Sequence, residues 1–317
     1  MATTPKWWTE DTVALVTGAN KGIGYEIVRA FATEGLRVVL TARDPAKGQA
    51  AVDELKAAGL KNIYFHKLEV SSPESVKTLA TWLKEKFGGL DILVNNAGAV
   101  GGSAPGLDGV KVTYENAKEI IDINYFGVKN VTEGLLPVFR ASPAGARIVN
   151  ATSRVGLYER LKGPLLETFR DEDNYSKKLA DSLATKYIED VKKGKFVEEG
   201  WLPEEKGKLP MYCESKMIEN VYSIALAKSL AKVQPEQHQI YVTSFCPGTT
   251  QTTMYARGAE DGGFEAPSGF QLKTPADGAD TGVWLALLPK EEIVDKVGKF
   301  YGERTEYLFG WKNPPFA

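Results

Sequence analysis

The stretch TGANKGIG, from Thr17 to Gly24, constrains the fold of this chain more than any other feature. It follows the apolar run VALV, precedes a helical pattern and contains three glycines. Glycine disfavours helix and is used where the backbone must come close to another group. Bare amides at the start of a helix can hold a phosphate. The stretch therefore predicts either a phosphate-binding turn between a strand and a helix or a turn of the same shape that binds nothing.

Short apolar runs alternate with longer amphipathic stretches through the first 150 residues. Strands separated by helices indicate βαβ units, whose right-handed crossovers produce an α/β fold with a doubly wound parallel sheet. The predicted strands are Val13–Thr17, Arg37–Thr41, Ile63–Leu68, Asp91–Asn95, Arg147–Ala151, Ile240–Phe245 and Gly298–Tyr301. The predicted helices include Ile23–Glu34, Pro45–Ala58, Ser72–Phe87 and Ala117–Phe139.

Two segments interrupt this alternation. Residues 155–210 contain no predicted strand and include a charged helical stretch whose apolar positions fall on one face. Residues 255–273 are rich in glycine and polar residues, which predicts a mobile loop. We expect one domain over residues 1–317, with a helical insertion at about 155–210 and a substrate loop at about 255–273.

The composition argues against binding to nucleic acid, insertion in a membrane and a metal site. The formal net charge is −2, so no strong field attracts nucleic acid or an anionic membrane. No apolar run approaches the roughly 20 residues that span a bilayer. The two cysteines are too few for a disulfide framework, which favours the cytoplasm, and the two histidines lack metal-ligand spacing, so we expect no metal site.

The residue after the second predicted strand indicates which cofactor the turn would hold. A site that prefers NAD usually places an acid there to bind the ribose 2′-hydroxyl, whereas Arg43 stands there in this chain. A guanidinium pairs bidentately with a 2′-phosphate, and Lys21 and Lys47 add charge. This pattern predicts NADPH, unless Arg43 is only a surface charge and Asp44 binds the ribose.

Tyr212 and Lys216 are four residues apart and share one face if that segment is helical. A phenol has a pKa near 10, and a neighbouring ammonium lowers this pKa toward the working range. The hydroxyl of Ser153 can orient a carbonyl oxygen. The pair could also be ordinary surface residues, but its place within a dinucleotide-binding pattern favours acid–base chemistry.

Six motifs in order carry a resemblance to the short-chain dehydrogenase/reductase superfamily. They are TGANKGIG, NNAG at Asn95–Gly98, Asn124 in DINYFG, IVNATS ending at Ser153, YCESK from Tyr212 to Lys216, and CPG at Cys246–Gly248. Further stretches such as VVLTARD and YIEDVKKGKFVEEGW resemble the carbonyl reductase branch, which includes animal carbonyl reductases and plant menthone, isopiperitenone and salutaridine reductases. The resemblance implies a Rossmann-type sheet of about seven strands, a helical insertion between Ser153 and Tyr212, and a monomer.

The resemblance also implies roles for individual residues. Ser153, Tyr212 and Lys216 would be catalytic, and Asn124 would hold a water for proton relay. Glu69 stands where an aspartate usually binds adenine, and Asn95 is either structural or near the adenosine. The residues implied to bind the cofactor are Gly18, Asn20, Lys21, Gly22, Ile23, Gly24, Arg43, Lys47, Glu69, Asn95, Gly98, Pro247, Gly248 and Thr252.

The implied reaction is NADPH-dependent reduction of a ketone or aldehyde to an alcohol. The presence of Tyr212 favours this carbonyl chemistry. A hydrophobic substrate such as a terpenoid or an alkaloid suits the apolar segments around the site. Two alternatives remain at this point: a reductase of conjugated C=C bonds on the same frame, and a catalytically inactive NADP-binding sensor.

Overall fold

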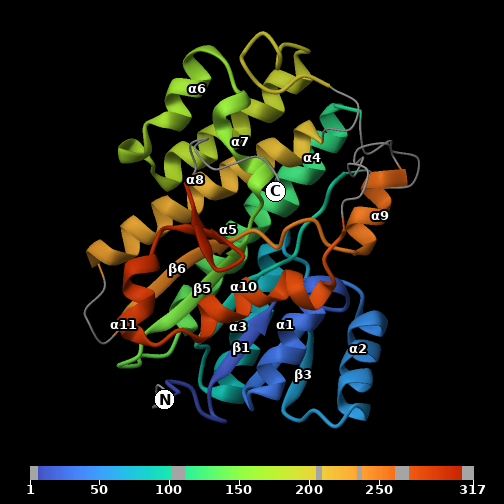
Figure 1. The fold of residues 1–317 in the computed structure, drawn as a ribbon, viewed down its shortest axis with the longest axis vertical. Helices are drawn as coiled ribbons and strands as arrows, with labels where there is room; N and C mark the ends of the chain where they lie inside the picture. The colour runs from blue at the N-terminus through green and yellow to red at the C-terminus, as the bar shows by residue number, and fades with distance from the viewer. Residues whose placement is uncertain (1–5, 102–110, 205–208, 234–237, 261–270, 309–317) are drawn as a thin grey trace.

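The centre of the molecule is one eight-stranded sheet (Figure 1). The computed structural model describes residues 6–101, 111–204, 209–233, 238–260 and 271–308. The strand order is β3-β2-β1-β4-β5-β6-β7-β8, and only the last pair is antiparallel. This order reverses beside β1, which confirms the doubly wound α/β fold. The strands are β1 Val13–Val16, β2 Arg37–Ala42, β3 Ile63–Lys67, β4 Ile92–Asn95, β5 Ala146–Ala151, β6 Ile240–Phe245, β7 Phe300–Gly302 and β8 Thr305–Tyr307.

The central strands are buried on both faces, as parallel strands between two helical layers must be. Successive side chains of β1 alternate between two hydrophobic cores: Val13 and Leu15 belong to one, Ala14 and Val16 to the other. Helices α1, α2 and α10 cover one face, and α3, α5 and α8 cover the opposite face (Figure 1). The α-helices are α1 Gly22–Thr33, α2 Pro45–Ala57, α3 Pro73–Phe87, α4 Tyr114–Ile121, α5 Val128–Leu135, α6 Gly163–Arg170, α7 Lys177–Lys192, α8 Pro210–Val233, α9 Thr253–Glu260, α10 Pro275–Leu287 and α11 Lys290–Ile293.

Side-chain hydrogen bonds cap the starts of several helices. The hydroxyl of Ser72 accepts a hydrogen bond from the Ser75 amide at 3.2 Å, with Pro73 at the first position of α3. Thr274 and Asp277 form a reciprocal capping box at the start of α10. These local bonds determine where each helix leaves the carboxyl end of the sheet.

Three features differ from the sequence-based expectation. Strand β8 adds an eighth strand through a turn whose central residues, Glu303 and Arg304, have φ values of 52° and 58°. Such turns favour Asn and Gly, so this hairpin carries no turn signal in the sequence. The expected helix over Ala117–Phe139 begins at Tyr114 and contains a π-helical turn at Asp122–Gly127.

The expected loop over residues 255–273 begins with helix α9. The hydroxyl of Thr252 accepts a hydrogen bond from the Tyr255 amide at 3.1 Å, which caps this helix. Residues 261–270 of the expected loop lie outside the described residues.

The segment between Ser153 and Tyr212 holds helices α6 and α7, and its described residues form no strand. Helix α7 packs against α8 and α4 on the outer side of the sheet's second helical layer (Figure 1). The aromatic side chains of Phe169, Tyr187 and Trp201 pack together there and join the main core. This segment is therefore integrated with α8, the helix that carries Tyr212 and Lys216.

Candidate active site

The glycine turn has the close approaches that its sequence suggests. Gly18 and Gly22 have φ values of 61° and 60°, in the left-handed region that favours glycine. A Cβ atom on Gly18 would lie 2.8 Å from the Cα atom of Ala97, and one on Gly24 would lie 2.4 Å from the Nδ2 atom of Asn96. The three glycines therefore let the turn pack against the end of β4 and leave the start of α1 open.

Asn96 fixes this turn, although sequence reasoning did not assign it a role. Its side-chain amide donates hydrogen bonds to the carbonyls of Thr17 and Gly18, at 2.9 Å and 3.2 Å. Its neighbour Asn95 is buried and donates to Thr132 and Asn150, both at 2.9 Å. The NNAG motif contains both asparagines. Successive side chains at a strand end point to opposite sides, and this alternation distinguishes Asn96, which faces the glycine turn, from Asn95, which is buried.

A cleft of about 400 Å³ runs from the glycine turn to the carboxyl ends of β4, β5 and β6. It brings together most of the residues singled out from the sequence. The predicted residues that line it are Gly18, Asn20, Lys21, Gly22, Ile23, Arg43, Glu69, Gly98, Ser153, Tyr212, Lys216, Pro247, Gly248 and Thr252. Four predicted residues do not line it: Gly24, Lys47, Asn95 and Asn124.

Asp44 does not compete with Arg43 for a ribose. One carboxylate oxygen of Asp44 accepts hydrogen bonds from the amides of Ala46 and Lys47, at 3.0 Å and 3.1 Å, and so caps α2. These bonds lower the pKa of Asp44, the one from the Lys47 amide most. The ammonium of Lys47 lies 3.5 Å from the other carboxylate oxygen, away from the cleft. Arg43 is thus the charged side chain that this strand end presents to the cleft.

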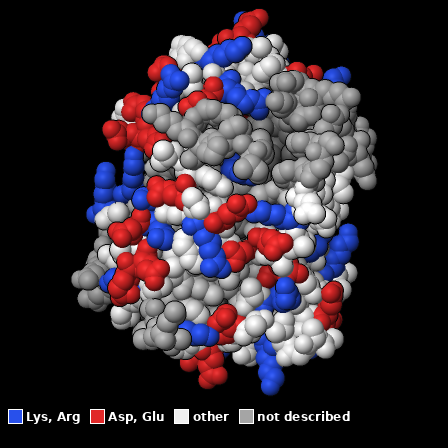
Figure 2. All heavy atoms as spheres, viewed as in Figure 1, with Lys and Arg blue, Asp and Glu red and all other residues white. Residues whose placement is uncertain are grey.

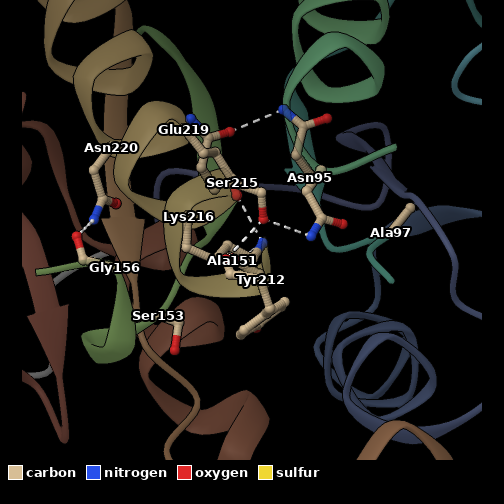
Figure 3. Close-up of polar contacts among 12 residues, drawn as sticks. Asn95, Ala97, Ala151, Ser153, Gly156, Tyr212, Ser215, Lys216, Glu219 and Asn220 are labelled. Atoms are coloured by element: carbon tan, nitrogen blue, oxygen red, sulfur yellow. Dashed lines mark hydrogen bonds and ion pairs between the residues drawn. The ribbon is translucent and has the colours of Figure 1, made fainter. Parts of the chain in front are cut away.

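Three candidate catalytic side chains meet at the carboxyl end of β5 (Figure 3). Ser153 follows that strand, and Tyr212 and Lys216 lie one turn apart on α8. The Lys216 ammonium donates to the carbonyl of Ala151 at 2.9 Å and lies 5.7 Å from the centre of the Tyr212 ring. A strand end and a helix far apart in the sequence thus supply one site.

Asn124 lies behind this site rather than in the cleft. Its side chain exchanges two hydrogen bonds with the backbone of Ala99, both 2.8 Å long, and donates to the Ser215 hydroxyl at 2.9 Å. Since its amide is engaged in this way, the side chain joins the end of β4 to α8. The π-helical turn around Asn124 widens the helix at this point, as π-turns often do at functional sites.

Comparison with known proteins identifies the family. Residues 12–165 match the family model described as short chain dehydrogenase. A (+)-neomenthol dehydrogenase of Arabidopsis thaliana is 36% identical, with 88% of this chain and 92% of that protein covered. Carbonyl reductase (NADPH) 1 of Mus musculus is 38% identical, with the same two coverages. This chain belongs to the short-chain dehydrogenase family.

A solved structure supports the same assignment. Salutaridine reductase from Papaver somniferum superposes with a TM-score of 0.76 at 32% identity, covering 92% of this chain and 99% of that one. The similarity to plant and animal reductases that the sequence motifs suggested is confirmed.

The pKa of Tyr212 in this short-chain dehydrogenase is shifted in the opposite direction from the sequence-based expectation. Burial raises the pKa of Tyr212 above its ordinary value, and Lys216 and the Ser153 hydroxyl only partly offset that effect. The phenol is therefore protonated at neutral pH, which suits a proton donor. The expectation that Lys216 would dominate was wrong because it left out the desolvation of the phenol.

The surface of the dehydrogenase shows mixed charge. On the face in Figure 2, acidic and basic side chains alternate without a large patch of one sign. Among the helices described, none has the length and apolar character that a membrane span requires. Within the same residues, no cluster of three potential metal ligands occurs.

Proposed function

We propose that this chain reduces a ketone or an aldehyde to an alcohol with NADPH. It is an NADP-dependent oxidoreductase of the short-chain family. The observation that carries the proposal is that Ser153, Tyr212 and Lys216 all line the cleft that begins at the glycine turn. A proton donor, a carbonyl-orienting hydroxyl and a cation therefore face the space where a dinucleotide would end.

The cleft has the features that NADPH requires. The N-cap of α1, Lys21, makes no side-chain capping hydrogen bond, and the two glycines with positive φ leave room beside the first-turn amides for a pyrophosphate. Arg43 lines the cleft while Asp44 is held by its capping bonds, which favours a 2′-phosphate over a bare ribose. When bound, NADPH supplies a hydride to the substrate carbonyl carbon.

Each of the three side chains has a separate task. The Tyr212 phenol donates its proton to the carbonyl oxygen as that oxygen gains negative charge. The Ser153 hydroxyl donates a hydrogen bond to the same oxygen and fixes its direction. The charged Lys216 lowers the energy of the phenolate left on Tyr212 and offers a donor to the nicotinamide ribose.

The substrate end of the cleft is mostly apolar. Val100, Val155, Met254 and Cys246 line it together with Tyr255. Such a lining suits a hydrophobic ketone, and relatives named neomenthol dehydrogenase and salutaridine reductase support a terpenoid or alkaloid class. We propose that α9, whose Met254 and Tyr255 line the cleft, belongs to the substrate loop.

We also propose that the α6–α7 segment is an insertion that keeps the protein monomeric. Helix α7 covers α4 and α8, so those helices are not available to a second copy. A cytoplasmic location remains a prediction from the sequence.

Replacing Tyr212 by Phe tests the proposed reaction. We expect NADPH oxidation with a panel of ketones to fall about 10²- to 10⁴-fold, because the proton donor is lost. NADPH affinity and melting temperature should stay close to wild type. Tyr222→Phe is the matched control, since Tyr222 lies on the same helix, is buried and does not line the cleft.

Two other outcomes would favour the alternatives. Saturation of an enone with its carbonyl intact, in wild type and Tyr212→Phe alike, would indicate a C=C reductase. Tight NADPH binding without turnover of any carbonyl or enone would indicate a sensor.

A further inference from the structure

Helix α8 buries a carboxylate directly beside the candidate catalytic lysine. Glu219 lies three residues after Lys216, and its Oε2 atom is 2.6 Å from the Lys216 ammonium. The side chains of Lys216 and Glu219 are 4% and 0% exposed. Figure 3 shows the two residues on the side of α8 that faces the end of β5.

The ammonium of Lys216 has three N–H donors, and two of them have partners in the protein. One donates to the Ala151 carbonyl at 2.9 Å and one to Glu219. Lys216 and Ala151 line the cleft, whereas Glu219 does not. The ion pair with Glu219 therefore holds the ammonium from outside the cleft and leaves one donor for a ligand within it.

Burial makes the charge on Lys216 costly without a counter-ion, because a desolvated lysine readily loses its proton. The groups that act on Lys216 electrostatically are Glu219, Tyr212 and Cys246. Burial lowers the pKa of Lys216, but Glu219, Tyr212 and Cys246 together outweigh burial and raise it, with Glu219 contributing most. Tyr212 carries no negative charge until it gives up its proton, so Glu219, 2.6 Å from the ammonium, is the carboxylate that balances the charge on Lys216 at that stage.

We propose that Glu219 is a positioning residue that keeps Lys216 protonated and directs its third donor into the cleft. The proposal rests on the proposed function, because it assigns Lys216 the task described there. Glu219 acts through Lys216 and does not line the cleft itself.

The carboxyl group of Glu219 becomes charged in the pH range in which Lys216 needs a counter-ion. Burial raises the pKa of Glu219 to about 7, against the opposing effect of Lys216. Above that pH the carboxylate is charged, and this is the range in which a buried lysine without a partner would lose its proton. The pair therefore maintains the charge on Lys216 toward alkaline pH.

Glu214 provides a matched control on the same helix. It is also fully buried, and burial raises its pKa to about 8. Its Oε1 atom accepts a hydrogen bond from the Leu202 amide at 2.8 Å, so its partner is backbone rather than an ammonium. Replacement by glutamine preserves that bond.

The experiment compares wild type with E219Q, E219D and E214Q in two measurements from pH 6 to 10. These are NADPH oxidation with a ketone substrate and the dissociation constant for NADPH from its fluorescence. In E219Q we expect the alkaline limb of both profiles to move down by about one pH unit or more, which is about tenfold at a fixed alkaline pH. E219D should restore part of this shift, and E214Q should keep the wild-type profile.

Superimposable pH profiles for E219Q and wild type would overturn the proposal. A loss of equal size at every pH would also overturn it, because that result indicates damage to the fold alone. If wild type itself turns over no carbonyl, the proposed function fails, and the NADPH-binding profile still decides the role of Glu219.

Discussion

The amino and carboxyl ends of the parallel strands both bury charged side chains. At the amino end, Arg147 is fully buried and its guanidinium donates to the carbonyls of Ala144, Gly145, Ala146 and Leu288 at 2.9 to 3.3 Å. The guanidinium carbon lies 4.4 Å from the ring centre of Trp7 and 4.8 Å from that of Tyr241. Burial lowers the pKa of Arg147 to about 10.

At the carboxyl end, Lys216 is equally buried, but its partners do not use all of its donors. Ala151 and Glu219 take two, which leaves one donor on a side chain that lines the cleft. The Nη1 and Nη2 atoms of Arg147 donate to protein carbonyls, while its buried Nε has no hydrogen-bond partner among the described residues. The comparison indicates that a buried charge such as Arg147 is structural because its partners are protein groups. A buried charge such as Lys216 can take part in chemistry because it has a donor left for a ligand.

The largest effect should come from the carboxyl end. Ser153→Ala removes the hydroxyl that orients the carbonyl oxygen, and we expect kcat to fall about 10²- to 10³-fold. The melting temperature should change little, because the hydroxyl accepts a long 3.3 Å hydrogen bond from the Val155 amide and otherwise interacts with the Tyr212 phenol at the cleft. Steady-state kinetics and calorimetry measure the two quantities. If Ser153→Ala lowered the melting temperature and left kcat unchanged, the carboxyl end would be structural like the amino end, and the comparison would fail.

At the amino end, Arg147→Met should act on stability instead. The substitution leaves buried carbonyls without their donor, and we expect the free energy of unfolding to fall by about 2–4 kcal/mol. Urea denaturation measures this loss, and kcat per folded molecule should equal that of wild type. A kcat loss larger than the unfolded fraction explains would show that the amino end also serves the reaction.

Strand β2 allows the same comparison with one residue type at its two ends. Arg43→Asp at the carboxyl end should weaken NADPH binding about 10- to 100-fold and leave NADH binding less affected, because a 2′-phosphate loses its charged partner. Arg37→Asp at the amino end is the control, since Arg37 pairs with Asp11. Titration of both cofactors against both variants measures the difference. Equal losses for NADPH and NADH in Arg43→Asp would count against the proposed preference.

The smallest effect should come from a helix cap outside both ends of the sheet. The hydroxyl of Ser176 accepts a hydrogen bond from the Leu179 amide at 3.1 Å at the start of α7. Ser176→Ala should reduce stability by about 1 kcal/mol, without changing kcat or KM. Thermal denaturation and kinetics provide this baseline. A change in KM would instead connect the α6–α7 segment to substrate binding.

Much of the fold and site could be predicted because the signals are local. Glycines between a strand and a helix, a serine cap before Pro73 and alternating β-branched runs each reflect short-range sterics or a single hydrogen bond. The helix positions of Tyr212 and Lys216 follow from their spacing, and both side chains do line the cleft. Strand β8 was missed because its turn uses Glu303 and Arg304 in place of the usual asparagine and glycine.

Other site properties depended on groups distant in the sequence. Asn124 was predicted to hold a water, and the structure shows that its side chain bonds Ala99 and Ser215, which leaves that prediction untested. Lys47 was predicted to bind the cofactor, and in the structure its ammonium lies 3.5 Å from Asp44 beside the start of α2. In both cases, contacts with residues that the sequence motifs did not indicate determine where the side chain points.

From the sequence alone follow the order of strands and helices, the glycine turn, and the residue types able to transfer a proton and bind a dinucleotide. These properties come from backbone sterics and from the chemistry of single side chains. Only the tertiary structure decides that Glu219 pairs with Lys216, that burial raises the pKa of Tyr212, and that Asp44 caps α2 while Arg43 lines the cleft. Desolvation and ion pairing depend on which atoms surround a charge, and packing of distant segments determines those surroundings.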